Sequence, residues 1–294
     1  MHKSGFVNII GNPNVGKSTL MNALVGEKLS IITSKAQTTR HRILGIVNGD
    51  DFQIVFSDTP GILKPCYKLQ ESMMNFVRGA LSDADVLLYV TDTVERDDEH
   101  AAEIIDRIRQ SGVPTLVVVN KIDLTTQEAL EALVEKWRAT LPDAEIIPIS
   151  AREGFNIAGL FDRILALLPE GEPFYPKDTL TDKTLRFFAS EIIREKILRN
   201  YDKEIPYSCE IEIEEYREEP GIDRISAVIY VARNSQKGIL IGHKGEKLKK
   251  VGRQAREELE EFLRKKVFLQ LFVKVSEDWR NDQRQLRRFG YDPQ

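Results

Sequence analysis

The sequence has few of the residues that build zinc sites or disulfide frameworks. Its 294 residues include four histidines and only two cysteines, Cys66 and Cys209, with no CxxC pair. Such widely spaced cysteines argue against zinc and favour a reducing compartment. No apolar run approaches the roughly 20 residues that cross a bilayer, and no signal-peptide cleavage site follows the first residues. We therefore expect a cytoplasmic protein.

The sequence also has no large excess of charge of either sign. The formal net charge is -4 with a pI near 5.8, which gives no global sign of nucleic-acid binding. A sum over the whole chain can hide a basic patch on one domain, so charge has to be considered locally. The hydrophobic content of 41% and the charged content of 30% are near globular averages. The length suggests two domains of roughly 150 residues each.

The order of apolar segments predicts two different folds. In the first half, short apolar runs such as FVNII, FQIVF, VLLYV and TLVVV alternate with helix-period segments, including one over 98–111. This pattern predicts a mostly parallel, doubly wound α/β domain over 1–170. A stretch with three prolines then predicts a linker at 171–183. Residues 184–294 have the order helix, strand, strand, helix, strand, which predicts a small α+β domain and a tail.

The segment GNPNVGKS matches the phosphate-loop pattern G-x-x-x-x-G-K-S, between a strand and a helix. Its glycines allow backbone N–H groups to surround phosphate oxygens. Lys17 adds positive charge at the β- and γ-phosphates, and the Ser18 hydroxyl can ligate Mg²⁺. The predicted nucleotide contacts in this segment are Gly11, Asn12, Pro13, Asn14, Val15, Gly16, Lys17, Ser18 and Thr19.

The tetrapeptide DTPG directly follows the apolar strand FQIVF. The carboxyl end of a sheet strand would hold Asp58 opposite the phosphate loop, where it suits a metal-holding acid. The backbone N–H of Gly61 would approach the γ-phosphate, and the loop after it would order with that phosphate. The predicted contacts here are Asp58, Thr59, Pro60 and Gly61.

The tetrapeptide NKID follows the strand TLVVV and predicts the choice of base. A carboxylate at Asp123 accepts hydrogen bonds from guanine N1–H and the exocyclic amine, and adenine offers no such pair. This disfavours an ATPase or kinase. Ser150 and Ala151 follow the strand EIIPI, where the Ala151 N–H suits guanine O6. Asn120, Lys121, Asp123, Ser150 and Ala151 are the predicted contacts.

The polar segment SKAQTTRHR has the place of a switch loop, in which a threonine completes the Mg²⁺ shell when GTP is bound. Thr39 is the first candidate and Thr38 the alternative. The predicted metal ligands are thus Ser18, Thr39 and Asp58. Ile62 follows DTPG, and its apolar side chain cannot orient water as a glutamine would. We therefore expect slow intrinsic GTP hydrolysis.

Taken together, GNPNVGKS, QTTR, DTPG, NKID and SAR resemble the Era family of bacterial Ras-like GTPases. In the second half EIIREKI, IPYS, IGHKG and the closing WRND…LRRFGY follow the order of that family's type II KH domain. The resemblance covers nearly the whole chain. It implies a monomeric ribosome-assembly GTPase whose KH domain binds the 3′ end of small-subunit ribosomal RNA, with peripheral contact at the inner face of the cell membrane left open.

The resemblance also extends to cofactors and catalysis. Family members with an asparagine in the phosphate loop are similar to the TrmE-type group, in which this residue helps to hold a monovalent cation. Here it is Asn14, so K⁺ joins Mg²⁺ as a candidate cofactor. The predicted catalytic residues are then Lys17, Asn14, Thr39 and Gly61.

The IGHKG turn carries the predicted RNA site. Its two glycines let the backbone approach a sugar-phosphate chain, and the following helix offers N–H groups and lysines. The predicted contacts are Gly242, His243, Lys244, Gly245, Lys247, Lys249 and Lys250. Arg264 to Lys266 are more typical of a solvated helix end than of an RNA contact. Trp279 has two open interpretations, stacking on RNA or packing of the terminal helix.

A second function also fits these residues. The chain would then be a GTP-controlled RNA-binding module with little turnover, which uses GTP only to set its shape. A third class, a GTPase that modifies tRNA or works at membranes, has less support because the appended domain resembles KH.

Overall fold

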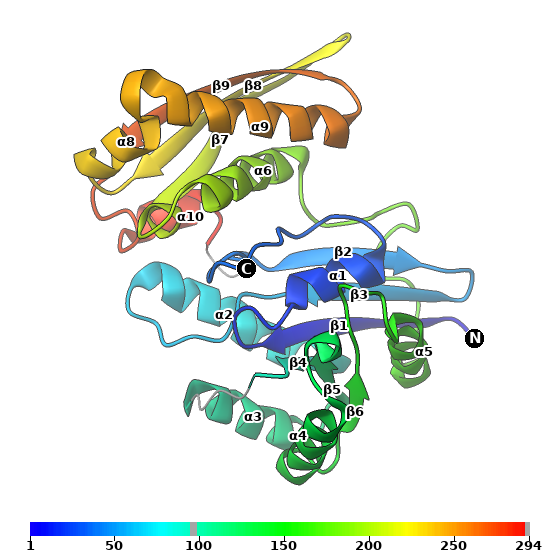
Figure 1. Ribbon diagram of the computed structural model, residues 1–294. Helices are drawn as coiled ribbons and strands as arrows, with labels where there is room; N and C mark the ends of the chain where they lie inside the picture. Colours follow the sequence, from blue (N-terminus) through cyan, green and yellow to red (C-terminus); the bar gives the residue numbers. More distant parts are fainter. Residues whose placement is uncertain (95–98, 292–294) are drawn as a thin grey trace. The chain divides into compact units, whose positions relative to one another are not determined.

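A computed structural model describes residues 1–94 and 99–291 (Figure 1). The chain divides into two compact units. The first comprises Met1–Cys66 and Gln70–Asp182, and the second comprises Tyr67–Leu69 and the chain from Lys183 to Tyr291. Residue 98, where one helix was expected to begin, lies outside the described residues.

The first unit is built on a six-stranded sheet with the strand order β2-β3-β1-β4-β5-β6. All neighbours are parallel except β2 and β3, which form an antiparallel pair. The predicted mostly parallel α/β fold is therefore confirmed. The strands are β1 (Lys3–Gly11), β2 (Ile43–Asn48), β3 (Phe52–Asp58), β4 (Val86–Asp92), β5 (Thr115–Asn120) and β6 (Glu145–Pro148).

Helices cover both faces of this sheet (Figure 1). They are α1 (Lys17–Val25), α2 (Lys68–Ser82), α3 (Glu99–Ser111), η1 (Ile122–Leu124), α4 (Gln127–Thr140) and α5 (Ile157–Leu167). Apolar side chains of α2, α3 and α4, such as Val77, Ile108 and Leu133, pack with Val117 and Val119 of β5 in one buried cluster. Helices α1 and α5 contact each other on the opposite face.

The segment predicted as a linker is ordered against the first unit. The Gln53 side chain on β3 is fully buried, and its Oε1 accepts hydrogen bonds from the backbone N–H groups of Phe174 (2.7 Å) and Tyr175 (3.0 Å). The N–H of Ile46 on β2 donates to the carbonyl oxygen of Leu180 at 2.8 Å. This part of the chain therefore belongs to the first unit up to Asp182.

The second unit has a three-stranded sheet with the order β7-β8-β9, in which β7 and β8 are antiparallel and β8 and β9 parallel. Helices α6 and α9 contribute Ile193, Ile197 and Val251 to a core under the sheet. The predicted small α+β domain is confirmed. Its elements are α6 (Leu185–Asn200), α7 (Ile205–Ser208), β7 (Cys209–Glu219), β8 (Ile222–Val231), α8 (Asn234–Ile241), η2 (His243–Gly245), α9 (Glu246–Leu263), β9 (Lys266–Val275) and α10 (Gln283–Arg288).

Trp279 packs inside the second unit. Its side chain is fully buried, its Nε1–H donates to the carbonyl oxygen of Ser208 at 3.1 Å, and its ring meets that of Phe289 edge on. A buried indole that has already used its donor cannot stack on a base. Of the two open interpretations, packing of the terminal helix is therefore correct.

Candidate guanine-nucleotide and RNA sites

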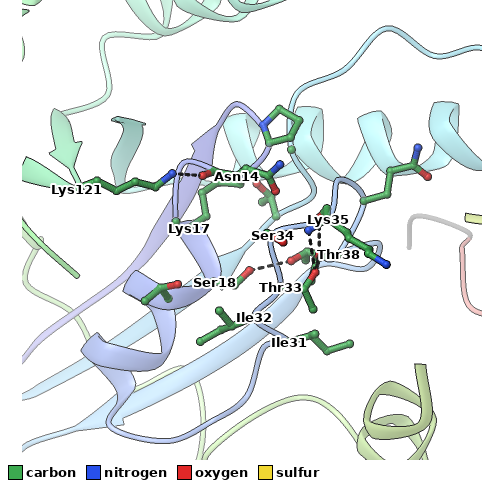
Figure 2. Close-up of a pocket in the computed structure, with 17 residues that line it drawn as sticks. Asn14, Lys17, Ser18, Ile31, Ile32, Thr33, Ser34, Lys35, Thr38 and Lys121 are labelled. Carbon is green, nitrogen blue, oxygen red and sulfur yellow. Dashed lines mark hydrogen bonds between the residues drawn. The ribbon is translucent and has the colours of Figure 1, made fainter. Parts of the chain in front are cut away.

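The predicted nucleotide residues meet at the carboxyl ends of four parallel strands. The phosphate loop follows β1, Asp58 ends β3, Asn120 ends β5, and Ser150 follows β6. In an open α/β sheet this edge is where ligands bind. A pocket of about 320 Å³ lies here, lined by the phosphate loop, residues 31–39, Thr59, Gly61 and Lys121 (Figure 2).

The phosphate loop leads directly into α1, which begins at Lys17. Gly16 caps this helix with φ of 97°, and a Cβ there would lie 2.3 Å from Nδ2 of Asn120. Only glycine fits this position without strain. The N–H groups of the first turn of α1 thus face the pocket as an anion site.

Lys17 is buried, and its Nζ donates hydrogen bonds to the carbonyl oxygens of Gly11 (2.9 Å) and Asn12 (2.8 Å). Burial lowers the pKa of Lys17 from 10.5 to about 8, although the nearby Asp58 carboxylate acts in the opposite direction. A buried ammonium with neutral partners is costly. Phosphate oxygens would supply the missing negative charge.

The three predicted metal ligands lie together. Ser18 Oγ is 2.9 Å from Thr39 Oγ1 and 2.7 Å from Asp58 Oδ2, and Thr39 Oγ1 is 3.4 Å from the same carboxylate oxygen. The alternative, Thr38, instead donates to the carbonyl oxygen of Lys35 at 2.6 Å and lies 2.6 Å from Thr33 Oγ1 (Figure 2). The geometry therefore supports Thr39 over Thr38.

Asp58 is fully buried, and this burial raises the pKa of its carboxyl group, against the hydrogen bond from Ser18 and the charge of Lys17. Its second oxygen, Oδ1, is buried and accepts no hydrogen bond within the described residues. A carboxylate with one oxygen beside two hydroxyls and the other without a donor fits a hard divalent cation such as Mg²⁺.

On the guanine side, Asn120 joins two loops. Its Nδ2 donates to the carbonyl oxygen of Val15 at 2.9 Å, and its Oδ1 accepts from the N–H of Ala151 at 2.9 Å. Asp123 is exposed, and its Oδ1 accepts from the hydroxyl of Ser150 at 2.6 Å. The Asp123 carboxylate is thus oriented, and its other oxygen stays open for a base.

Lys121 has a partner that the sequence reasoning missed. Its Nζ donates to the carbonyl oxygen of Asn14 at 2.5 Å (Figure 2). It also donates to Oδ2 of Asp92 at 2.8 Å, and Asp92 is buried at the end of β4. Asn14 itself has φ of 64°, in the left-handed region. Asp92 lies two residues after the apolar run VLLYV, and the strand that contains this run pairs with the strand that leads into NKID. An acidic residue at that strand end is the sequence signal that could have identified it.

The DTPG segment lies close to the phosphate loop. A Cβ at Gly61 would lie 2.8 Å from Cα of Pro13, so a larger residue would push the two loops apart. The side chain of Ile62 is buried in the core that underlies α2, α3 and α4. The Ile62 side chain is therefore not among those that line the pocket. This agrees with the expectation that no side chain at this position orients water.

In the second unit, the IGHKG turn joins α8 to α9. Gly242 has φ of 73° and Gly245 has φ of 78°, while His243 and Lys244 are exposed. Gly245 precedes the first turn of α9 and has no side chain to cap it. Lys247, Lys249 and Lys250 are exposed on the same turns of that helix. The structure thus leaves His243 and the lysines of the predicted RNA site exposed at the turn and at the start of α9.

The fold and the two sites define a P-loop GTPase joined to a KH domain. Residues 6–121 match the family model described as 50S ribosome-binding GTPase, and residues 204–280 match a KH domain model. The chain is 46% identical to GTPase Era of Syntrophus aciditrophicus, over 99% of this chain and 96% of that protein. It is 45% identical to GTPase Era of Alkaliphilus metalliredigens, over 99% of each. The chain belongs to the Era family and is a GTPase.

Two solved structures of Era match the full length. One is a complex of Era with MgGDPNP and nucleotides 1506–1542 of 16S ribosomal RNA, with a TM-score of 0.95, 42% identity and 100% of both chains covered. The other is a variant of Aquifex aeolicus Era bound to GDP and AlF₄⁻, with a TM-score of 0.95, 42% identity and 99% of this chain and 100% of that chain covered. The family predicted from the sequence motifs is therefore confirmed.

Proposed function

We propose that this GTPase binds the 3′ end of small-subunit ribosomal RNA through its KH domain and assists maturation of the small ribosomal subunit, with the bound nucleotide controlling attachment. The observation that carries the proposal is the exposed basic GHKG surface on the same chain as a guanine site. A similar Era structure that contains a 16S ribosomal RNA fragment supports it.

Hydrolysis would proceed by in-line attack of water on the γ-phosphate. Lys17 and the N–H groups at the start of α1 would hold the phosphates and stabilise the charge that develops on them. Ser18 and Thr39 would hold Mg²⁺, with Asp58 beside them, and the ion would neutralise charge on the β- and γ-phosphates. Because Ile62 is buried, no side chain at that position orients the water, and we expect slow intrinsic turnover.

Asn14 is the proposed ligand of a monovalent cation. Its left-handed backbone lies on the exposed side of the phosphate loop, and its side chain lines the pocket. K⁺ at this place would add the positive charge that an arginine finger supplies in other GTPases. We expect faster hydrolysis in K⁺ than in Na⁺ buffer for the natural chain, and equal rates in Asn14→Ala. Equal rates in the natural chain would refute K⁺ as a cofactor.

The proposal keeps a GTPase domain over 1–170, a linker over 171–183 that packs on this domain, and a KH domain with its tail over 184–294, in a monomer that works in the cytoplasm. No helix among the described residues is long and apolar enough to cross a membrane. Contact with the inner face of the cell membrane would be peripheral, and flotation with anionic vesicles tests it.

Crosslinking to cellular RNA, with GDPNP or GDP bound, tests the ribosomal assignment. We expect crosslinks at the 3′ end of small-subunit ribosomal RNA that depend on the nucleotide. Removing both lysines in Lys249→Ala/Lys250→Ala should weaken them, because phosphate contacts carry most of the affinity. The control Lys136→Ala/Arg138→Ala removes the same charge from exposed positions of α4. Crosslinks scattered over unrelated transcripts would refute the assignment.

The alternative, a GTP-controlled module with little turnover, differs in one measurement. Phosphate release under multiple-turnover conditions should continue well beyond one equivalent per protein. Release that stops after a single burst would favour the alternative.

A further inference from the structure

Arg42 ends the switch loop (residues 34–42) and binds three other segments of the first unit. Its Nε donates to Oγ of Ser57 on β3 at 2.7 Å, and one terminal nitrogen donates to Oδ1 of Asn8 on β1 at 3.2 Å. The two terminal nitrogens also bind both carboxylate oxygens of Asp83, just after α2, at 2.6 and 3.0 Å. We name these four residues, Arg42, Ser57, Asn8 and Asp83, the arginine clasp.

Two members of the clasp are buried in the sheet. Asn8 and Ser57 are fully buried in the sheet, and Asn8 Nδ2 donates to the carbonyl oxygen of Ala80 (2.6 Å) and to Oδ1 of Asp83 (2.7 Å). The end of α2 is thus fastened to β1 without Arg42. The Arg42 side chain is 18% exposed and closes the network from the side of the switch loop.

Three of the four segments that meet in the clasp continue to the nucleotide site. Strand β1 leads to the phosphate loop at Gly11, β3 ends at Asp58 one residue after Ser57, and Arg42 follows Thr39 by three residues. A planar guanidinium can satisfy several acceptors at fixed angles, and a lysine ammonium cannot. The clasp therefore fixes where the switch loop joins β2.

We propose that Arg42 is a positioning residue for the GTP-bound site: it anchors the carboxyl end of the switch loop so that the Thr39 hydroxyl reaches Ser18 and Asp58. The inference rests on the proposed role of Thr39 as a metal ligand. Because that role matters when the γ-phosphate is present, loss of the anchor should weaken binding of GTP analogues and leave GDP binding nearly unchanged.

The test compares GDPNP with GDP by fluorescent-nucleotide displacement over a range of Mg²⁺ concentrations. In Arg42→Ala we expect GDPNP affinity to fall by about tenfold or more, from the lost charge-assisted hydrogen bonds, with GDP affinity within about twofold. The GDPNP complex should also need more Mg²⁺. Arg42→Lys should have a GDPNP affinity nearly as low as that of Arg42→Ala, because a lysine keeps the charge but lacks the planar guanidinium. The GDPNP affinity of Asp83→Asn should lie between those of Arg42→Ala and the natural chain.

Arg163→Ala is the matched control, because Arg163 pairs with Glu145 on the surface of the same unit, away from the switch loop. A lowered melting temperature with an unchanged ratio of GDPNP to GDP affinity would show a merely structural role for Arg42 and overturn the inference. Full rescue by Arg42→Lys would also overturn it. Thr39→Ala separates the role of Thr39 as a metal ligand from the role of Arg42. Normal GDPNP binding by Thr39→Ala would refute the metal assignment. Weak GDPNP binding by Thr39→Ala together with normal binding by Arg42→Ala would refute the positioning role of Arg42 alone.

Discussion

A buried lysine in an anion site makes nucleotide binding depend on pH. Lys17 has its pKa lowered by burial to about 8 in the free protein, and bound phosphates favour its charged form. Above pH 8, binding must therefore take up a proton. We expect GTP affinity to be flat below pH 8 and to fall by up to about tenfold per pH unit above it. Titration with a fluorescent nucleotide between pH 6.5 and 9.5, in steps of about 0.5 pH unit, measures this affinity.

The same lowered pKa acts on folding with a definite sign. Since the folded state binds this proton less tightly than the unfolded state, the contribution of Lys17 to the free energy of unfolding rises as the pH rises from about 8 toward 10.5.

The control for the pH dependence of nucleotide binding is Lys17→Ala. This variant should lose the pH dependence of GTP affinity together with much of the affinity itself. A slope that persists in this variant would assign the titration to another group.

The two adjacent threonines of the switch loop form a natural pair for comparison. Thr39 lies 2.9 Å from the Ser18 hydroxyl, whereas Thr38 bonds within its own loop. We expect Thr39→Ala to reduce the hydrolysis rate by about 100-fold, since the metal shell loses a ligand, and Thr38→Ala to reduce it by less than about fivefold. Steady-state phosphate release measures both. The reverse order would exchange their roles.

Sequence patterns predicted which residues meet at this edge of the first sheet, and not the contacts that join them. Lys17, Asp58 and Asp123 follow from motif and strand order. The contacts of Asn120 with Val15 and Ala151, and of Lys121 with Asp92, join segments far apart in the chain. Trp279 had two interpretations because an indole serves packing and stacking equally well, and only its burial decides.

At the scale of elements, the proline-rich segment after α5 is held in part by one buried side chain, that of Gln53. Gln53 accepts from Phe174 and Tyr175, and its Nε2 donates to the carbonyl oxygen of Tyr175 and to Oδ1 of Asn48. We expect Gln53→Ala to destabilise the first unit by about 1–3 kcal/mol, because two part-buried backbone N–H groups lose their acceptor. Urea unfolding measures this change.

The control for this prediction is Gln127→Ala. Gln127 is exposed on α4, where its Nε2 donates to Oε1 of the exposed Glu131 at 2.9 Å, so its loss should cost less than about 0.5 kcal/mol. Hydrogen exchange gives a second readout: the amides of Phe174 and Tyr175 should lose protection in Gln53→Ala. Unchanged protection would show that the segment is held elsewhere.

Most elements could be predicted because apolar runs and helix periods are local signals. The strands FVNII, FQIVF, VLLYV and TLVVV all lie within observed strands. That the proline-rich segment is ordered could not be predicted in this way, since it is held by residues more than 100 positions earlier, Gln53 on β3 and Ile46 on β2. Composition alone makes such a segment look like a free tether.

For the whole molecule, the place where the chain is cut should decide whether the GTPase unit is stable alone. A fragment of residues 1–182 keeps the bonds from Ile46 to Leu180 and from Gln53 to Phe174. A fragment of residues 1–170 loses both. We expect the longer fragment to bind GDP like the full chain and the shorter one to melt at a lower temperature, as differential scanning fluorimetry would measure. Equal melting temperatures would contradict this.

The chain has two tryptophans, and each unit holds one. Trp137 lies half-buried on α4 with its ring 5.2 Å from that of Tyr89, whereas Trp279 is enclosed in the second unit. Replacing either by phenylalanine leaves a single emitter, bluer for the enclosed indole than for the half-buried one. The protein thus carries an optical label in each half, and the order in which the halves unfold can be followed without attaching a dye.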